Sequence, residues 1–296
     1  MLISSRTVLS NDLLDWAPRL RGIVFGSIGT NSCDVDHATS RGILVANGAT
    51  SENVESVAEA TVVLMAALLG ELLPKIGEFR HPPGRQVAAL SSRMLRGRTI
   101  GFLGFGRIAR QAHRRLQGWS VGRTLAWTRT PAEGFPDVEF TDLATVLAHS
   151  DVVSVHLPLS ARTRGLLDHR ALASMKSGAV LVNTARGGIV DEQALAEVLR
   201  SGHLAGAALD TFAQEPPPPD HPLAQCHNTI LTNHNAGHTG DLFASLVPAA
   251  VENTTALLDG RLPAYLANRE AVDQWRSRIS NPHRRSRTGT RGAIEE

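Results

Sequence analysis

The chain has 296 residues, 42% of them hydrophobic and 20% charged, and a formal net charge of +2. This balance is typical of a globular protein of one or two domains and excludes an evenly basic nucleic-acid-binding surface. Two cysteines, Cys33 and Cys226, provide neither a disulfide framework nor a metal cluster, and they indicate a reducing, cytoplasmic setting.

Membrane and nucleic-acid partners are not expected. No apolar run reaches the length of a membrane span, and the opening MLISSRTVLS lacks the features of a signal peptide. Positive charge gathers in residues 276–296, which hold six arginines against two glutamates. Because this segment is polar and has no apolar period, we expect a disordered basic tail rather than a nucleic-acid-binding arm.

The N-terminal part alternates apolar runs with helical segments. GIVFGS (22–27) and GILVAN (42–47) predict short strands because each run is continuously apolar. A long helix is expected from Ser51 to about Leu73 and should end at Pro74. At roughly 30 Å, this helix would be long enough to pass from one domain to another.

The middle of the chain alternates strand-like with helix-like segments, which predicts an α/β fold with a parallel sheet covered by helices on both faces. The predicted strands are 99–105, 124–127, 152–157, 179–184, 205–210 and 229–232, and the predicted helices are 107–116, 141–150, 169–175 and 191–202. After Asn235 the pattern is helical again. We therefore expect a central domain of residues 75–235 and a smaller domain built from residues 1–74 and 236–275, followed by the tail at 276–296.

A glycine-rich turn lies between the first central strand and helix. TIGFLGFGRIAR places Gly104, Gly106 and Ala109 in a G-x-G-x-x-A pattern. The first glycine permits a tight turn, the second lets backbone approach a pyrophosphate, and the small third residue lets helix and strand pack closely. With the helix N-terminus attracting phosphate charge, the motif predicts a doubly wound, Rossmann-type domain that binds NAD or NADP, rather than a merely structural turn.

The end of the next predicted strand bears on the choice between NAD and NADP. An acidic residue there would bind the ribose hydroxyls of NAD, but the chain has Thr128, Arg129 and Thr130. No carboxylate would repel a 2′-phosphate, and Arg129 would be able to pair with one. We therefore expect NADP to be preferred, the alternative being that Arg129 is an ordinary surface residue and NAD binds.

Three polar residues follow three successive predicted strands. Arg186 comes after AVLVNT, Glu215 after AGAALDTF and His234 after TILT. Because ligands bind beyond the carboxyl ends of parallel strands, we expect these side chains to meet beside the cofactor. An arginine there would hold a substrate carboxylate, and a histidine oriented by a glutamate would exchange a proton.

The segment LTNHNAGHT also contains His238, four residues after His234. This spacing would suit a metal only on a helix, but the intervening Asn-Ala-Gly favours a loop. We therefore expect no metal, with His234 as the acid/base residue and His238 at the rim.

These motifs resemble the D-isomer-specific 2-hydroxyacid dehydrogenase family. The resemblance is carried by GFGRIAR, VHLPLSARTRGLLD, LVNTARGGIVDEQALAEVL, AALDTFAQEPPPPDHPL and LTNHNAGHT. It implies NAD(P)-dependent interconversion of a small 2-oxo acid and a D-2-hydroxy acid by a homodimer, with a flavodoxin-like substrate domain as the smaller domain. It also implies Arg186 as the substrate anchor, Glu215 as the partner of the acid/base residue and His234 as that residue.

The same resemblance implies a wider set of contacts. The Ser27, Ile28 and Gly29 turn would bind the substrate carboxylate together with Arg186, and Asp210 would contact the nicotinamide. Expected cofactor contacts are Gly104, Gly106, Arg107, Ile108, Thr128, Arg129, Leu157, Pro158, Thr163, Thr184, Ala185, Asp210, His234 and Ala236. Asn233 stands where the family usually has proline. The opening βα segments of the substrate domain are expected to be missing, either because the domain is truncated or because the sequence starts late.

Two other functions are compatible with this fold. The same fold occurs in corepressor-like proteins that sense dinucleotides with little turnover, but such a binder would need none of Arg186, Glu215 and His234. Formate or phosphite oxidation is disfavoured because the formate branch, by resemblance, has glutamine where this chain has Glu215. The identity of the 2-oxo acid, glyoxylate-like, hydroxypyruvate-like or phosphoglycerate-like, stays open at this stage.

Overall fold

The computed structural model describes residues 1–3, 7–30, 32–80 and 91–280. The described chain divides into a central unit, Val54–His238, and a terminal unit made of Met1–Asn53 and the residues from Thr239 onward. The first boundary therefore lies at 53/54 instead of the expected 74/75. The reason is that helix α3 (Ser51–Leu69) buries Ala58, Val62 and Met65 in the core of the central unit.

The central unit contains a seven-stranded sheet in which every neighbouring pair is parallel. Its order is β10-β9-β8-β7-β4-β5-β6, so the chain builds outward from β4 to one side and then returns to build from β7 to the other. The strands are β4 (Thr99–Leu103), β5 (Arg123–Trp127), β6 (Val138–Phe140), β7 (Val152–Val155), β8 (Val180–Asn183), β9 (Gly206–Leu209) and β10 (Thr229–Leu231). The predicted doubly wound α/β fold is confirmed, and only the short β6 was not foreseen.

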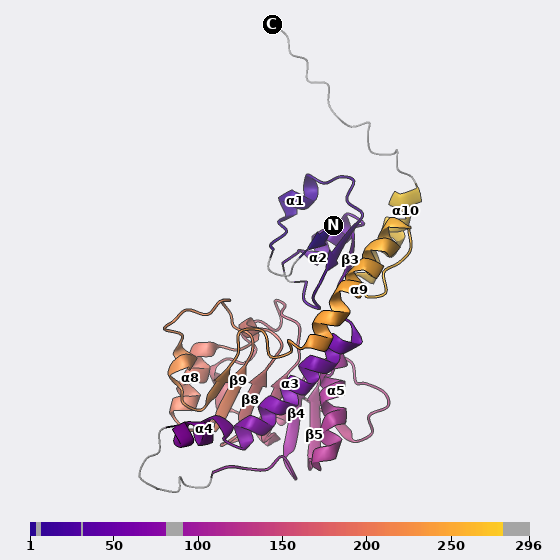
Figure 1. Cartoon of the computed structure of the whole chain (residues 1–296). Helices are drawn as coiled ribbons and strands as arrows, with labels where there is room; N and C mark the ends of the chain where they lie inside the picture. Colours follow the sequence, from indigo (N-terminus) through magenta and orange to yellow (C-terminus); the bar gives the residue numbers. More distant parts are fainter. Residues whose placement is uncertain (4–6, 31, 81–90, 281–296) are drawn as a thin grey trace. The chain divides into compact units, whose positions relative to one another are not determined.

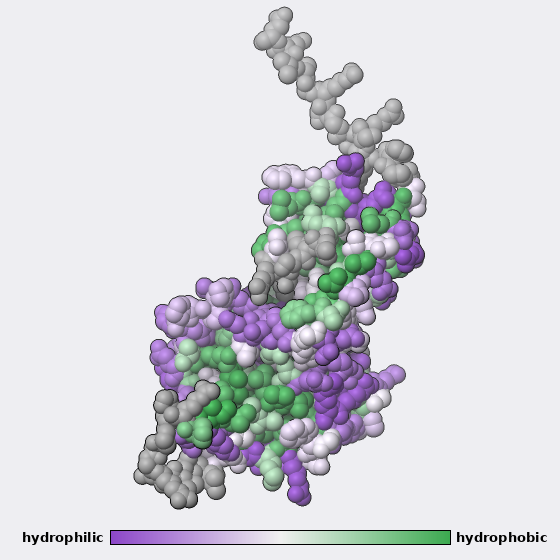
Figure 2. All heavy atoms as spheres, viewed as in Figure 1, coloured by the Kyte–Doolittle hydropathy of each residue, from purple (hydrophilic) through white to green (hydrophobic). Residues whose placement is uncertain are grey.

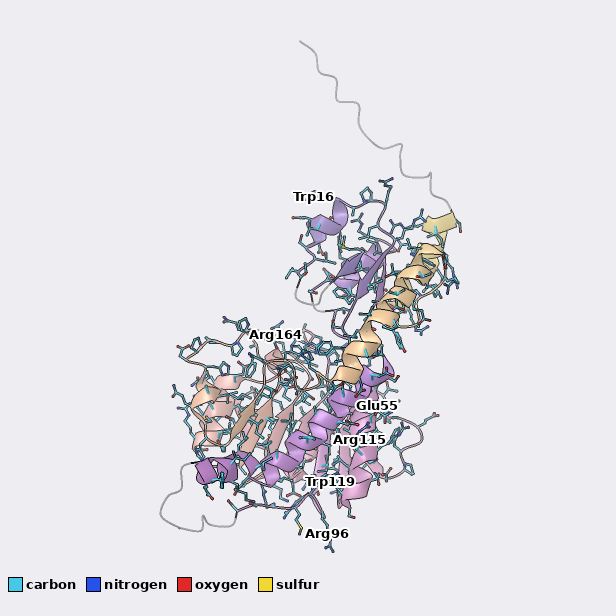
Figure 3. All side chains as sticks on the ribbon, viewed as in Figure 1. Trp16, Glu55, Arg96, Arg115, Trp119 and Arg164 are labelled. Atoms are coloured by element: carbon cyan, nitrogen blue, oxygen red, sulfur yellow. The ribbon has the colours of Figure 1, made fainter. Side chains whose placement is uncertain are left out.

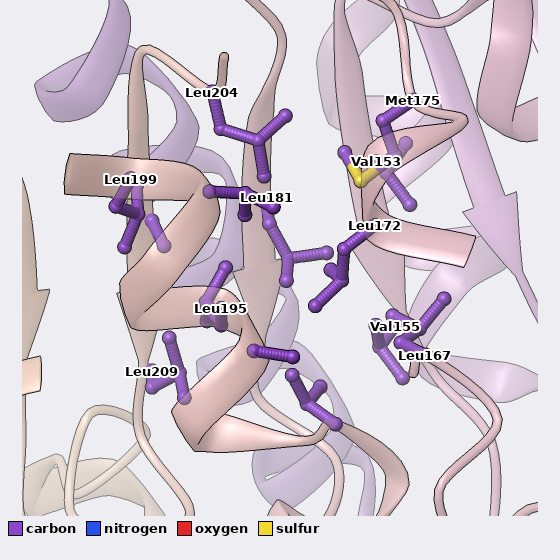
Figure 4. Packing of buried hydrophobic residues seen from close by; sticks show 14 of the residues in the cluster. Val153, Val155, Leu167, Leu172, Met175, Leu181, Leu195, Leu199, Leu204 and Leu209 are labelled. Carbon is purple, nitrogen blue, oxygen red and sulfur yellow. The ribbon is translucent and has the colours of Figure 1, made fainter. Parts of the chain in front are cut away.

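Helices cover both faces of this sheet, as Figure 1 shows. On one face, α3 and α5 (Arg107–Leu116) share a buried apolar cluster with β4. On the other face, α6 (Leu143–His149), α7 (His169–Ala173) and α8 (Glu192–Arg200) share a second buried apolar cluster with β4, β5, β7, β8 and β9, and Figure 4 shows its packed leucines and valines. Because each of β7, β8 and β9 is buried along its whole length, their sequences are continuously apolar rather than alternating.

Local capping explains where the helices of the second face begin. Asp142, Asp168 and Asp191 are the N-cap residues of α6, α7 and α8. Each side chain accepts a hydrogen bond from the backbone N–H three residues later, at 2.8 to 3.0 Å. These bonds satisfy N–H groups that the first turn of a helix leaves unpaired, which typically contributes about 1 kcal/mol per cap.

The predicted helix from Ser51 to Leu73 is wrong at its C-terminal end. Helix α3 ends at Leu69, Glu71 adopts a left-handed φ of 50°, and a second helix, α4, runs over Leu72–Arg80. Pro74 does not end a helix but lies in the first turn of α4, where its missing N–H would have no intrahelical partner. Among the described residues no single helix is long and apolar enough to cross a membrane, and α3 with α4 meets that test only as a pair bent by 61°.

The terminal unit is a smaller α/β structure with a parallel sheet in the order β1-β2-β3. Its elements are β1 (Leu2–Ile3), α1 (Asn11–Asp15), β2 (Gly22–Phe25), α2 (Val35–Ser40), β3 (Leu44–Ala46), α9 (Gly240–Leu258) and α10 (Val272–Ser280). Asn268 joins the two ends of the chain, because its buried side chain accepts from Val45 N and donates to Ile43 O. Short 3-10 turns occur at η1 (Gln117–Trp119), η2 (Gly187–Ile189), η3 (Pro222–Gln225) and η4 (Arg269–Ala271).

The expected start of a disordered tail at Arg276 is wrong for residues 276–280, which belong to α10. Trp275 is 1% exposed and packs in a cluster with Ile279. Arg278 adds four hydrogen bonds from its guanidinium to the carbonyl oxygens of Arg41, Gly42, Pro18 and Leu20. The rest of the predicted tail, 281–296, lies outside the described residues.

Candidate active site

The turn after β4 has the shape required of a phosphate cradle. Gly104 has a φ of +88°, and a Cβ added there would lie 2.6 Å from the carbonyl oxygen of His156. Gly106 is the N-cap of α5, and a Cβ added to it would meet nothing within 4 Å. Ala109 is fully buried, which allows α5 to lie close to the sheet. Open space before an N-terminus without a capping side chain fits the pyrophosphate of a dinucleotide.

The cradle lies where the strand order reverses, between β4 and β7. Beyond β5, on one side of it, Thr128 is half-buried and Arg129 exposed. The segment from Thr128 to Ala132 contains no carboxylate, as the sequence had indicated. These residues lie at the side of the cradle where the ribose of a bound dinucleotide is expected.

Two predicted cofactor residues on the other side of the cradle are held in place by hydroxyl hydrogen bonds. After β7, Thr163 Oγ1 donates to Pro158 O at 2.6 Å and accepts from Ser160 N, which closes a compact turn. After β8, the Thr184 hydroxyl lies 3.0 Å from that of Thr61, which itself donates to a backbone carbonyl of α3. Because the Thr61 hydroxyl proton is used in that bond, the Thr184 hydroxyl is the donor to Thr61. The lone pairs of the Thr184 oxygen therefore point away from Thr61.

Arg186 follows β8 in an extended conformation fixed by Asn183. The Asn183 side chain donates to Arg186 O at 2.9 Å and accepts from Ala185 N at 3.0 Å. Burial lowers the pKa of the Arg186 guanidinium, and the charge of Glu215 opposes that shift. Glu215 is thus close enough to act electrostatically on Arg186. Even so, a guanidinium keeps its positive charge at neutral pH.

His234 and Glu215 form a direct pair. His234 Nδ1 lies 2.8 Å from Glu215 Oε2, while Glu215 Oε1 accepts from Phe212 N at 3.0 Å. The two side chains are 47% and 35% exposed, so the ring can be reached from solvent. With Nδ1 on the carboxylate, Nε2 is the nitrogen left for proton exchange.

Asp210 fixes the backbone of the His234 loop. Its Oδ1 accepts from Thr232 Oγ1, Asn235 N and Ala236 N at 2.7 to 2.9 Å, and its carbonyl accepts from His234 N. These bonds hold His234 at a φ of +53°, a conformation that is uncommon for a residue other than glycine. Asp210 is 5% exposed, so the carboxylate that fixes this loop is buried under it.

Asn233, the departure from the family pattern, takes part in this loop. Its backbone N–H donates to Asn235 Oδ1 at 3.1 Å, a bond that proline cannot make. No helix runs through residues 232–239, so His234 and His238 do not share a helical face, and His238 is exposed. In the described part of the chain, no group of three His, Cys, Asp or Glu side chains is arranged to hold a metal ion.

The structure therefore brings Arg186, Glu215 and His234 together at the carboxyl ends of neighbouring strands. The Ser27–Gly29 turn follows β2 in the terminal unit, where Gly48 N and the Asn47 side chain bind the carbonyls of Ser27 and Ile28. Its contact with a substrate stays a prediction.

Two residues near the site were not foreseen. His156 directly follows β7, and its carbonyl oxygen lies against Gly104, but the sequence had placed it inside the predicted strand 152–157. Thr61 lies on α3, 123 residues before Thr184, and no local sequence signal marks it.

The chain matches known proteins over most of its length. The model of the D-isomer specific 2-hydroxyacid dehydrogenase NAD-binding domain matches residues 62–236. A glyoxylate reductase from Thermofilum pendens (strain DSM 2475 / Hrk 5) is 37% identical over 270 residues, covering 88% of this chain and 78% of the relative. A D-3-phosphoglycerate dehydrogenase from Mycobacterium leprae (strain TN) is 36% identical over 246 residues, which cover 81% of this chain and 46% of the length of that relative. The crystal structure of an Aquifex aeolicus D-lactate dehydrogenase with NAD and lactic acid is 27% identical, with a TM-score of 0.82 over 90% of this chain and 85% of that one.

Proposed function

The chain belongs to the D-isomer specific 2-hydroxyacid dehydrogenase family, whose members transfer hydride between a nicotinamide dinucleotide and a 2-hydroxy acid, and we propose that it reduces a small 2-oxo acid with NADPH. The observation that carries the proposal is the pair formed by His234 and Glu215 beside Arg186. These residues lie at the carboxyl ends of the strands, the same edge of the sheet that contains the phosphate cradle. A protein that only binds a dinucleotide would need none of these three side chains.

In this proposal the three side chains divide the work on the substrate. Arg186 binds the carboxylate and polarises the neighbouring carbonyl, with the backbone of the Ser27–Gly29 turn as a second carboxylate ligand. As negative charge grows on the carbonyl oxygen, His234 Nε2 donates a proton to it. Glu215 holds the ring by Nδ1 and stabilises the imidazolium form that donates.

The cofactor is held by the cradle and by the residues that follow β5, β7, β8 and β9. Bound NAD(P)H supplies the hydride. We place the pyrophosphate at Gly104–Ile108, the nicotinamide near Asp210 and Ala236, and the remaining contacts at Leu157, Pro158, Thr163, Thr184 and Ala185. NADPH is preferred in this proposal because Thr128 and Arg129 offer a 2′-phosphate a cation and no repelling carboxylate.

The substrate is proposed to be a small 2-oxo acid of the glyoxylate or hydroxypyruvate type. The relative from Thermofilum pendens is named a glyoxylate reductase and aligns with 88% of this chain. A panel of 2-oxo acids, comprising glyoxylate, hydroxypyruvate, pyruvate and 3-phosphohydroxypyruvate, tested with NADPH and with NADH, would measure this directly. Turnover of glyoxylate or hydroxypyruvate supports the proposal. Dinucleotide binding without turnover of any member would instead support a sensing role.

We also propose that the protein is a homodimer that pairs through its central unit. Large apolar side chains are exposed on and beside α3 and α4: Val63, Leu72, Leu73, Ile76, Phe79 and Met94. Figure 2 shows hydrophobic side chains gathered on the face along which α3 runs. An exposed apolar patch of this kind typically marks a protein–protein interface. The outer side of α5 is polar by contrast, with Arg115 directed at Glu55 of α3 in Figure 3.

The compartment is proposed to be the cytoplasm. Cys33 and Cys226 are both buried free thiols, which suits a reducing environment. No nucleic-acid or membrane partner is part of the proposal.

A further inference from the structure

A second glutamate–histidine pair lies in the central unit, away from the reacting groups. His221 Nε2 is 2.9 Å from Glu192 Oε2, and their side chains are only 8% and 12% exposed. His221 Nδ1 accepts from Leu223 N at 3.3 Å, so the proton of the neutral ring is on Nε2 and is donated to Glu192. Both ring nitrogens are thereby engaged, and the ring has one fixed orientation.

The same glutamate holds the loop that follows β9. Glu192 Oε1 accepts from Ala213 N at 2.6 Å, so each carboxylate oxygen has its own partner. The ring of Phe212 packs edge-on against His221, with 5.2 Å between the ring centroids. Helix α8, which begins at Glu192, is therefore tied to the dipeptide Phe212–Ala213 by a charge-assisted bond and a ring contact.

This dipeptide contacts both sides of the candidate active site. Phe212 N donates to Glu215 Oε1, and Glu215 Oε2 is the atom that holds His234. On the other side, a Cβ added to Gly187 would lie 1.9 Å from the carbonyl carbon of Phe212. The backbone next to Arg186 is therefore packed directly on the dipeptide.

We propose that Glu192 and His221 are positioning residues that clamp Phe212–Ala213 and thereby set the carboxylate of Glu215 and the backbone of Arg186. The proposal rests on the proposed roles of His234, Glu215 and Arg186, and neither clamp residue contacts the substrate in it. A clamp of this kind matters because displacements of about 1 Å in a catalytic group can cost on the order of 100-fold in rate.

The test compares Glu192→Gln with a matched control. Glutamine can accept from Ala213 N, but its NH₂ would face the Nε2–H of His221, two donors with no acceptor between them. Asp151→Asn is the control because Asp151 is also a buried carboxylate that accepts from one side chain, that of Lys176, and from one backbone N–H, that of Thr99. It lies at the amino ends of β4 and β7, opposite to the candidate active site.

Glyoxylate reduction with NADPH is expected to separate the two variants. Glu192→Gln should lower kcat about tenfold. It should also move the pH at which the rate halves to a lower value, because a displaced Glu215 carboxylate stabilises the His234 imidazolium less effectively. NADPH Kd should change little. Asp151→Asn should lower Tm while leaving kcat and the pH profile as in the unsubstituted protein. Histidine NMR of the cofactor-free protein gives a readout without turnover, because the ring signals of His234 should change position in Glu192→Gln and not in Asp151→Asn.

Substitutions at His221 keep the test decisive if Glu192→Gln folds poorly. Gln at 221 can still donate to Glu192, so His221→Gln should retain most of the activity that His221→Ala loses. The clamp is overturned if Glu192→Gln matches Asp151→Asn, or if His221→Ala keeps full kcat and an unchanged pH profile. His234→Ala, measured alongside, distinguishes the failures: unchanged kcat in that variant would contradict the proposed function, whereas a large loss there with no effect at Glu192 and His221 would contradict the clamp alone.

Discussion

His234 is held at two points that differ in kind: its Nδ1 is 2.8 Å from Glu215 Oε2, and its backbone N–H donates to Asp210 O at 2.7 Å. The first contact controls the charge and orientation of the ring. The second controls the left-handed backbone on which the ring is mounted. A side chain fixed in both ways is suited to proton exchange at Nε2.

Replacing His234 by alanine should lower kcat for 2-oxo acid reduction by about 10² to 10⁴-fold, the usual contribution of general acid catalysis. Cofactor affinity should stay nearly unchanged, because the cradle at Gly104–Ile108 is not altered. Steady-state kinetics and NADPH titration measure the two quantities. His238→Ala is the control, and it should change neither. If His238→Ala were the damaging variant and His234→Ala the mild one, the assignment of the acid/base residue would be wrong.

Replacing Glu215 by glutamine should shift the pH dependence of reduction downward. Reduction requires imidazolium, and without the carboxylate this form loses its proton at lower pH. The glutamine carbonyl can accept from Phe212 N while its NH₂ donates to Nδ1 of the neutral ring, so the neutral form keeps its geometry, whereas Nδ1–H of the imidazolium would face a second donor. Glu197→Gln, on the exposed side of α8, should leave the profile where it is. An unshifted profile in Glu215→Gln would show that the charge of Glu215 is not used.

The parts of the site that could be predicted from sequence are the local ones. Gly104, Gly106 and Ala109 are recognisable because the turn, the phosphate approach and the helix packing each demand a small residue at fixed spacing. Arg186, Glu215 and His234 could be inferred because the carboxyl ends of parallel strands meet at one edge. Both inferences need only the pattern of strands and helices.

The parts that could not be predicted depend on conformation or on contacts distant in sequence. The break between α3 and α4 arises at Gly70 and Glu71, where nothing in the helical periodicity marks a change. The hydroxyl contact of Thr61 with Thr184 joins residues from two elements that only the folded chain brings together. Helix α10 was missed because its apolar residues, Val272, Trp275 and Ile279, are few and are surrounded by arginines.

Cofactor preference is predicted to depend on Thr128. NADPH should bind more tightly than NADH, and Thr128→Asp should raise the NADPH Kd by about tenfold or more, a repulsion worth about 1.4 kcal/mol against the 2′-phosphate. Fluorescence titration of both cofactors checks this. Thr128→Asn, of similar size but uncharged, should preserve the preference. Equal or tighter NADH binding by the unsubstituted protein would contradict the proposed preference.

Assembly is predicted to depend on the exposed apolar residues of α3 and α4. Phe79 is 88% exposed, and Phe79→Glu should weaken the homodimer because a charge would be buried in its interface. Light scattering at micromolar concentration measures the mass. Trp16→Glu is matched in exposure, at 80%, but lies in the terminal unit, and it should leave the dimer intact. A monomeric unsubstituted protein would refute the proposed assembly.

Stability is predicted to fall with acid because of His156. Its ring packs beside Phe102 and against the Ser154 hydroxyl, and desolvation lowers the pKa of His156 from 6.5 to about 3. Below pH 6.5 the unfolded chain binds a proton at His156 that the folded chain does not bind. The free energy of unfolding is therefore highest above that pH and decreases as the pH falls toward 3. Each pH unit in this window costs at most about 1.4 kcal/mol. Urea unfolding of His156→Asn should show a shallower loss between pH 6.5 and 4 than the unsubstituted protein. The exposed His149 provides the matched control, since His149→Asn should leave the slope of the free energy of unfolding against pH unchanged. Equal slopes in all three proteins would mean that protonation of His156 does not destabilise the folded state.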